Sequence, residues 1–154
     1  MNIQEAVAAV LDPELPLITI ADLGILRDVE VSADGTARVT ITPTYSGCPA
    51  MDAIAGEVRA AATAAGATDV EVVTVLSPAW TTDWITETGK AALAEHGIAP
   101  PGPVSGPVTL TLAVRCPQCG SPNTRELSRF SGTACKALHA CKDCKEPFER
   151  MKAH

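Results

Sequence analysis

Residues 37–76, ARVTITPTYSGCPAMDAIAGEVRAAATAAGATDVEVVTVL, decide the fold of this chain. Residues 37–42 and 69–76 alternate apolar and polar side chains at the period of a β-strand. Between them, residues 49–65 are rich in alanine and end at Gly66. The apolar side chains of this stretch share one helical stripe: Met51, Ile54, Val58 and Ala62. A strand, a helix and a second strand in this order predict two parallel strands joined by a right-handed crossover.

Three further elements complete the front of the chain. Residues 3–11 place their apolar side chains on one helical face, with Asn2 as the expected N-cap. Residues 27–31 alternate before a Ser-Ala-Asp-Gly turn, which predicts a hairpin with the strand at 37–42. Residues 82–95 predict a final helix. The expected fold class is α/β (α+β), a small mixed sheet covered by helices in the order α-β-β-α-β-α, plus a small four-cysteine zinc-ribbon-like tail.

A proline-rich stretch separates two parts of opposite charge. IAPPGPVSGPV, from Ile98 to Val108, contains four prolines and two glycines, so we expect neither helix nor regular sheet there. Residues 1–107 carry four Lys and Arg against fourteen carboxylates, whereas residues 108–154 carry eight against four. We therefore expect an α/β domain at 1–97, a linker at 98–107 and a metal-binding domain at 108–154.

Composition and charge argue against a secreted protein, a membrane-spanning protein and a nucleic-acid-binding protein. Hydrophobic residues make up 46% of the chain and aromatic residues 3%, which predicts an aliphatic core. We expect no signal peptide and no membrane span, and hence a cytoplasmic, reducing location where paired cysteines bind metal. The net charge of −6 disfavours a nucleic-acid partner, because phosphate would be repelled.

The tail contains two CxxC pairs, Cys116–Cys119 and Cys141–Cys144, separated by 21 residues. Each pair places two sulfurs on one tight turn, and two facing turns complete a tetrahedral four-sulfur cage. Zinc is the first choice of metal, while a single iron or a cluster stays open. The tail is expected to begin with a strand, VTLTLAV at 108–114. Cys135 is surplus to the cage, and the sequence assigns it no role.

Six side chains near the ends of the front elements are candidates for a functional site: Asp12, Glu14, Asp22, Thr42, Thr44 and Cys48. Cys48 stands before Pro49, which we expect at the first helical position. A cysteine at a helix N-terminus is stabilised as a thiolate by unpaired N–H groups. No histidine precedes residue 90 to act as a paired base, which favours transient metal binding over nucleophilic attack. Core or cap roles for Cys48, and turn roles for Asp12 and Asp22, stay open.

These motifs together resemble a known family. DPELPLITIADLGILRDVEV followed by VTITPTYSGCPAMDAI resembles the SufT-like iron–sulfur assembly domains, which share DPE, DLG and GCP elements. SPAWTTDWITETGKAALAEHGIAPP and the tail CPQCG…FSGTACKALHACKDCKEPFERMKAH extend this to a resemblance with the PaaD-like accessory proteins of phenylacetate catabolism. The resemblance covers nearly the whole chain.

The resemblance implies an accessory or maturation factor of the multicomponent phenylacetyl-CoA epoxidase, rather than its catalytic subunit. It carries over the six front residues as motif positions, with Cys48 as the reactive thiol. Cys48, Asp22 and Glu14 would hold iron or an iron–sulfur cluster transiently, and the implied partner is the oxygenase or the reductase component. The chain has no E-x-x-H pair for a di-iron centre and no nucleotide fingerprint, which agrees with a non-catalytic role.

Two alternatives stay open at this point. The chain would be a non-catalytic structural subunit of the epoxidase complex, in which Cys48 is only packed. Alternatively it would be an enzyme that uses Cys48 on a thioester such as a CoA ester. Self-association into a homo-oligomer is left open by the sequence.

Overall fold

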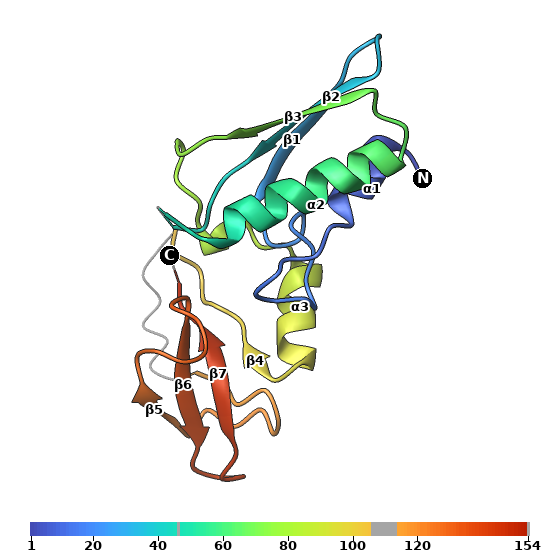
Figure 1. The fold of residues 1–154 in the computed structure, drawn as a ribbon. Helices are drawn as coiled ribbons and strands as arrows, with labels where there is room; N and C mark the ends of the chain where they lie inside the picture. The colour runs from blue at the N-terminus through green and yellow to red at the C-terminus, as the bar shows by residue number, and fades with distance from the viewer. Residues whose placement is uncertain (46, 106–113, 154) are drawn as a thin grey trace. The chain divides into compact units, whose positions relative to one another are not determined.

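The computed structural model describes residues 1–45, 47–105 and 114–153, which form two compact units that divide between Thr86 and Glu87 (Figure 1). Each unit has its own β-sheet. The strand expected at 108–114 lies outside the described residues, except for Val114. The role of 98–107 as a linker stays a prediction.

The sheet of the first unit has the order β1-β2-β3. β1 (Leu26–Val31) and β2 (Thr36–Ile41) form the predicted antiparallel hairpin. β3 (Asp69–Thr74) runs parallel to β2, with Val39 opposite Val72. The predicted parallel pairing of these two strands is thus confirmed. Parallel strands need a long crossover, and the 15-residue helix between β2 and β3 provides it by returning the chain to the end of the sheet where β2 began.

Two helices pack in this unit, α1 (Ile3–Ala8) against α2 (Ala50–Ala64), and α2 against β3. Asn2 caps α1 through a capping box with Glu5, as the sequence predicts for the cap. α2 begins one residue later than expected, since Pro49 is the N-cap and not the first helical residue.

An aliphatic core fills the space between helices and sheet. Its largest fully buried side chains come from both layers and from the loop that joins α1 to β1: Val7, Ile18, Ile20, Leu23, Ile25, Val39, Ile41, Ile54 and Val58. Ile54, Val58 and Ala62 bury the predicted stripe of α2, while Met51 at its start is only half-buried. Burying one such aliphatic side chain contributes about 1.5–3 kcal/mol to folding, so this core is a large favourable term in the stability of the first unit.

The prediction of one continuous helix over residues 82–95 is wrong. It divides into a 3₁₀ turn, η1 (Thr82–Trp84), and α3 (Glu87–Glu95). Ile85 between them is extended and 3% exposed, and the N–H of Thr86 donates to the carbonyl of Asp22. Burial of Ile85 and this bond to a distant loop outweigh local helix propensity.

The second unit contains α3 and a sheet of order β4-β7-β6-β5. These strands are β4 (Ile98–Ala99), β5 (Thr124–Ser128), β6 (Lys136–Cys141) and β7 (Pro147–Met151). The expectation of no sheet in the proline-rich stretch is wrong for β4, which pairs in parallel with β7. The prolines begin only at Pro100, so they do not remove N–H groups from this pairing.

Candidate functional site

Four cysteine sulfurs meet in the second unit, as the two CxxC pairs predict. The sulfurs of Cys116, Cys119, Cys141 and Cys144 all lie within 4.8 Å of one another. Sγ of Cys116 is 3.7 Å from that of Cys144, and Sγ of Cys119 is 3.6 Å from that of Cys141. Bonds of about 2.3 Å to a tetrahedral zinc ion would place sulfurs about 3.8 Å apart. The distances therefore fit a bound metal and are far too long for disulfides, and all four cysteines are free.

The two turns that carry these cysteines have the same backbone geometry. The N–H of Cys116 donates to the carbonyl of Ser121 and that of Cys141 to the carbonyl of Glu146, each at 2.9 Å. The residue after the second cysteine has positive φ in both turns, +75° at Gly120 and 67° at Lys145. The second unit therefore presents its ligands from two matched knuckles, the arrangement typical of a zinc ribbon.

A carboxylate ties the two knuckles together. Asp143, inside the second CxxC, accepts hydrogen bonds from the hydroxyl of Ser121 and from Nδ2 of Asn123, the latter at 3.0 Å. The N–H of Lys142 also donates to the carbonyl of Asn123 at 2.8 Å. The hydrogen bonds from Ser121 and Asn123 lower the pKa of Asp143, so it stays ionised. Such contacts behind the ligands orient a metal site.

Four thiols at these distances do not ionise independently. The N–H of Cys144 lowers the pKa of Cys141 to about 7. The N–H of Glu146 acts in the same direction on Cys144, but desolvation and the neighbouring thiols raise the pKa of Cys144 to about 12. A bound divalent cation removes this conflict, because it takes the sulfurs as thiolates.

The apolar core behind the cage is small. It consists of Ala99, Cys116, Cys141 and Phe148, with Val114 and Cys144 packed against it. Two of these four buried residues are cage cysteines. The donor set and the small core both fit a metal that supplies part of the folding free energy.

In the first unit, Asp12 is a turn-forming residue that is 5% exposed. Its Oδ1 accepts from the N–H of Glu14 at 2.9 Å and from the N–H of Leu15 at 2.8 Å. Burial raises the pKa of Asp12, although these two bonds oppose the change. The side chain of Glu14, in contrast, is exposed.

Asp22 connects two segments that are distant in sequence. Its Oδ1 accepts from the hydroxyl of Thr86 at 2.6 Å and its Oδ2 from the hydroxyl of Thr19 at 3.0 Å. Beside it, Nε1 of Trp80 donates to the carbonyl of Leu23 at 3.0 Å. Residues 80–86 therefore pack against the turn 22–24 and bond to it. The sequence analysis did not identify Thr19 and Thr86, because a hydroxyl that bonds a carboxylate leaves no periodic pattern in the sequence.

Thr42 follows β2 and is 1% exposed, but its Oγ1 has no hydrogen-bond partner in the described part of the chain. A buried hydroxyl without a partner costs about 1–3 kcal/mol. Thr44 is half-buried, as is Cys48, whose thiol is free. The connection from β2 to α2 therefore combines an unsatisfied hydroxyl with a free thiol.

The front candidates do not form a closed metal cage in this structure. Across residues 1–45, 47–105 and 114–153, the one group of three or more close metal-ligating side chains is the four-cysteine cage. Asp12 and Asp22 use their carboxylates in local hydrogen bonds. The functional role of Asp12, Glu14, Asp22, Thr42, Thr44 and Cys48 stays a prediction.

The fifth tail cysteine, Cys135, directly precedes β6, which an ion pair links to β7. Nζ of Lys136, on a side chain 9% exposed, is 3.0 Å from the Oε2 of Glu149. Sγ of Cys135 is 3.0 Å from the hydroxyl of Thr133. Lys136 is thereby explained as a structural residue, which the motif alone did not indicate.

Comparison with known proteins agrees with this division. Residues 1–75 match the family described as "Iron-sulfur cluster assembly protein", and residues 100–152 match the family described as "PaaD zinc beta ribbon domain". The chain thus joins an iron–sulfur assembly domain to a metal-binding zinc ribbon. It belongs to the PaaD family.

Individual relatives match either nearly the whole chain or its front. The chain is 48% identical to an Escherichia coli (strain K12) protein named as a subunit of a "Putative 1,2-phenylacetyl-CoA epoxidase", over 92% of this chain and 85% of that protein. It is 40% identical to "Fe-S protein maturation auxiliary factor YitW" of Bacillus subtilis (strain 168), over 60% of this chain and 90% of that protein. A solved DUF59 domain of unknown function from Bacillus anthracis has a TM-score of 0.54 at 30% identity, over 59% of this chain and 87% of that one.

In the described segments, no helix combines the length and the hydropathy needed to cross a lipid bilayer.

Proposed function

We propose that this protein assists the assembly of an iron or iron–sulfur centre in the oxygenase or reductase component of a phenylacetyl-CoA epoxidase. The observation that carries the proposal is the combination of two parts in one chain, an iron–sulfur assembly domain and a ribbon shared with an epoxidase-associated relative, at 48% identity over 92% of the chain. The relatives named as Fe–S maturation factors match only the front. In this proposal the front domain carries out the maturation chemistry, and the ribbon directs it to the components of the epoxidase.

The site that we propose for this chemistry centres on Cys48. Its thiol is half-buried, forms no disulfide and lies two residues before the start of α2. Asp22 and Glu14 would add oxygen ligands, and Asp12, Thr42 and Thr44 would shape the surrounding loops. The unsatisfied hydroxyl of Thr42 supports this proposal, because a cost of that kind is often found at functional sites. Iron or a cluster bound here is cargo and passes on to the partner.

For the tail we propose zinc as the resident metal. Four thiolates in a closed tetrahedral set are the donors of structural zinc sites. Because a closed site leaves no open coordination position, the tail metal would stabilise the ribbon and would not take part in the transfer of cargo.

The test replaces the thiol in cells. Cys48→Ala should lower epoxidase activity and the iron or cluster content of the partner subunits, while the tail keeps its metal. Cys135→Ala is the matched control, since it also removes one thiol outside the cage. Unchanged activity and partner cluster content in the Cys48→Ala strain would contradict the proposal.

A second candidate follows from the name of the E. coli relative, which calls that protein a subunit. In this case the chain would be a structural part of the epoxidase complex. It would then copurify with the oxygenase in fixed stoichiometry, and Cys48→Ala would leave the complex active. Purification as a separate monomer or dimer would count against it.

A further inference from the structure

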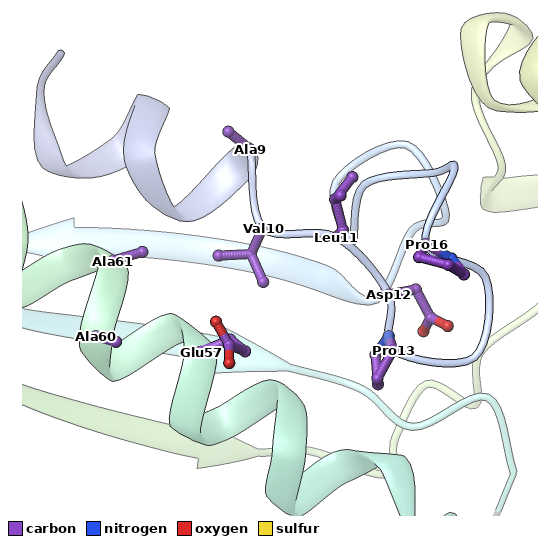
Figure 2. Close-up of a pocket in the computed structure, with 9 residues that line it drawn as sticks. All are labelled: Ala9, Val10, Leu11, Asp12, Pro13, Pro16, Glu57, Ala60 and Ala61. Atoms are coloured by element: carbon purple, nitrogen blue, oxygen red, sulfur yellow. The ribbon is translucent and has the colours of Figure 1, made fainter.

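A hollow of about 520 Å³ opens on the first unit, between the loop that follows α1 and the outer face of α2. The loop contributes Ala9, Val10, Leu11, Asp12, Pro13 and Pro16, and the helix contributes Glu57, Ala60 and Ala61 (Figure 2). Leu11 is 49% exposed, which is high for a large aliphatic side chain. The hollow is thus a largely apolar surface that the described part of this unit leaves uncovered.

The loop wall of the hollow is rigid. Ile20 donates its N–H to the carbonyl of Val10 at 2.8 Å, and Leu11 forms a β-bridge with Thr19. Asp12 closes the turn from inside, since its N–H donates to the carbonyl of Ile18 at 3.0 Å. Pro13 and Pro16 restrict the backbone further. A preformed wall lowers the entropic cost of binding.

Glu57 gives the hollow its charge. Figure 2 shows its side chain projecting from α2 toward the loop, between Val10 and Pro13. In the described residues its carboxylate has no ion pair and no hydrogen bond to a side chain or backbone. The first unit around it carries three Lys and Arg against twelve carboxylates. This excess of negative charge repels anions such as the phosphates of a CoA ester and attracts cations.

We propose that this hollow docks a segment of a partner protein that carries a lysine or arginine beside an aliphatic side chain. The aliphatic side chain would cover Leu11 and the two prolines, and the cation would pair with Glu57. The proposal rests on the proposed function only for the identity of the partner, an epoxidase component.

The direct test uses two model peptides, acetyl-Leu-Lys-Leu-Lys-Leu-amide and its glutamate counterpart. The lysine peptide should shift backbone NMR signals of residues 9–16 and 57–61, and its binding should weaken as salt is added. The glutamate peptide and phenylacetyl-CoA should leave these signals unchanged. Equal binding of both peptides, or shifts elsewhere, would overturn the proposal.

Two surface variants test the contacts. Glu57→Lys should weaken binding of the lysine peptide by about tenfold or more. Leu11→Ser should weaken it without changing the salt dependence. Glu30→Lys on β1 is the matched control, with the same charge change at an exposed position outside the hollow. Equal losses in Glu57→Lys and Glu30→Lys would refute a specific site, because only the net charge would then matter.

The same variants separate this inference from the proposed function. Each purified epoxidase component, and a second copy of the chain, is tested for binding to wild type, Glu57→Lys and Cys48→Ala. We expect one component to lose binding with Glu57→Lys and to keep it with Cys48→Ala. If Glu57→Lys binds and matures the component normally while Cys48→Ala fails to mature it, the docking site is wrong and the proposed function stands. Self-association abolished by Glu57→Lys would identify a second copy as the occupant and overturn the proposal.

Discussion

The buried carboxylate of Asp12 stabilises a turn through two backbone hydrogen bonds, but its desolvation costs free energy. Burial raises the pKa of Asp12, so between about pH 4 and the raised pKa the folded state retains a proton that the unfolded state has lost. The contribution of this group to the free energy of unfolding therefore falls as pH rises through that window. Its two backbone hydrogen bonds through Oδ1 partly compensate.

Asp12→Asn should be at least as stable as the wild type at pH 7, because the amide oxygen still accepts both hydrogen bonds and carries no charge. The difference should shrink as the pH is lowered toward 4. Asp12→Ala should lose about 1–3 kcal/mol, since two N–H groups lose their acceptor. Urea unfolding at several pH values measures both. An Asn variant as unstable as the Ala variant would show that the charge itself is required.

Lys145 has a left-handed backbone conformation, and the equivalent position of the other knuckle is occupied by a glycine, Gly120. Its φ is 67°, against +75° at Gly120. The left-handed region costs a side-chain-bearing residue about 1–2 kcal/mol, and glycine costs about 0.5–1 kcal/mol in entropy. With metal bound, Lys145→Gly should therefore gain about 0.5 kcal/mol and Gly120→Ala should lose a similar amount. Chemical unfolding with metal in excess tests the opposite signs, and changes of the same sign would contradict the symmetry of the knuckles.

At the scale of elements, residues 80–86 hold the turn 22–24 in place. Trp80 is 6% exposed, and its Nε1 donates to the carbonyl of Leu23. The guanidinium carbon of Arg27 lies over the ring of Trp84, 3.7 Å from the ring centroid. Trp80→Phe leaves that carbonyl without its donor and should cost about 1–3 kcal/mol. Trp84→Phe keeps an aromatic face for Arg27 and should cost less. Thermal unfolding compares the two variants, and an equal loss would show that the hydrogen bond is unimportant.

At the scale of the whole molecule, the two units differ in what stabilises them. The first unit has a large aliphatic core, whereas the buried cluster around the cage contains two cage cysteines, Cys116 and Cys141, among its four residues. A strong chelator should therefore unfold β5 to β7 and leave β1 to β3 and α2 folded. Amide hydrogen exchange, read separately for each unit, measures this.

The controls for metal removal are single substitutions. Cys116→Ser should mimic the chelator without any addition, and Cys48→Ser should retain the tail metal. Loss of protection in both units at once would show that they unfold as one, and full protection of β5 to β7 after chelation would show that the metal is not structural.

Periodic elements were predictable from the sequence, and interrupted ones were not. The hairpin and the stripe of α2 follow from local spacing, and the parallel pairing of β3 follows from the strand–helix–strand order. The break at Ile85 and the short β4 do not, since each depends on a contact with residues distant in sequence. Hydrophobic periodicity records which face is buried but not which distant backbone group completes a turn.

The four-cysteine cage was determined by the sequence itself, because two CxxC pairs place their sulfurs through local turns and need only to face each other. The front side chains carried no such local geometry. Only the tertiary structure decided that Asp22 binds Thr86, that Thr42 is buried without a partner, and that Glu57 faces the loop after α1. Spacing within a few residues fixes short-range geometry, whereas contacts across 40 or more residues depend on how the layers pack.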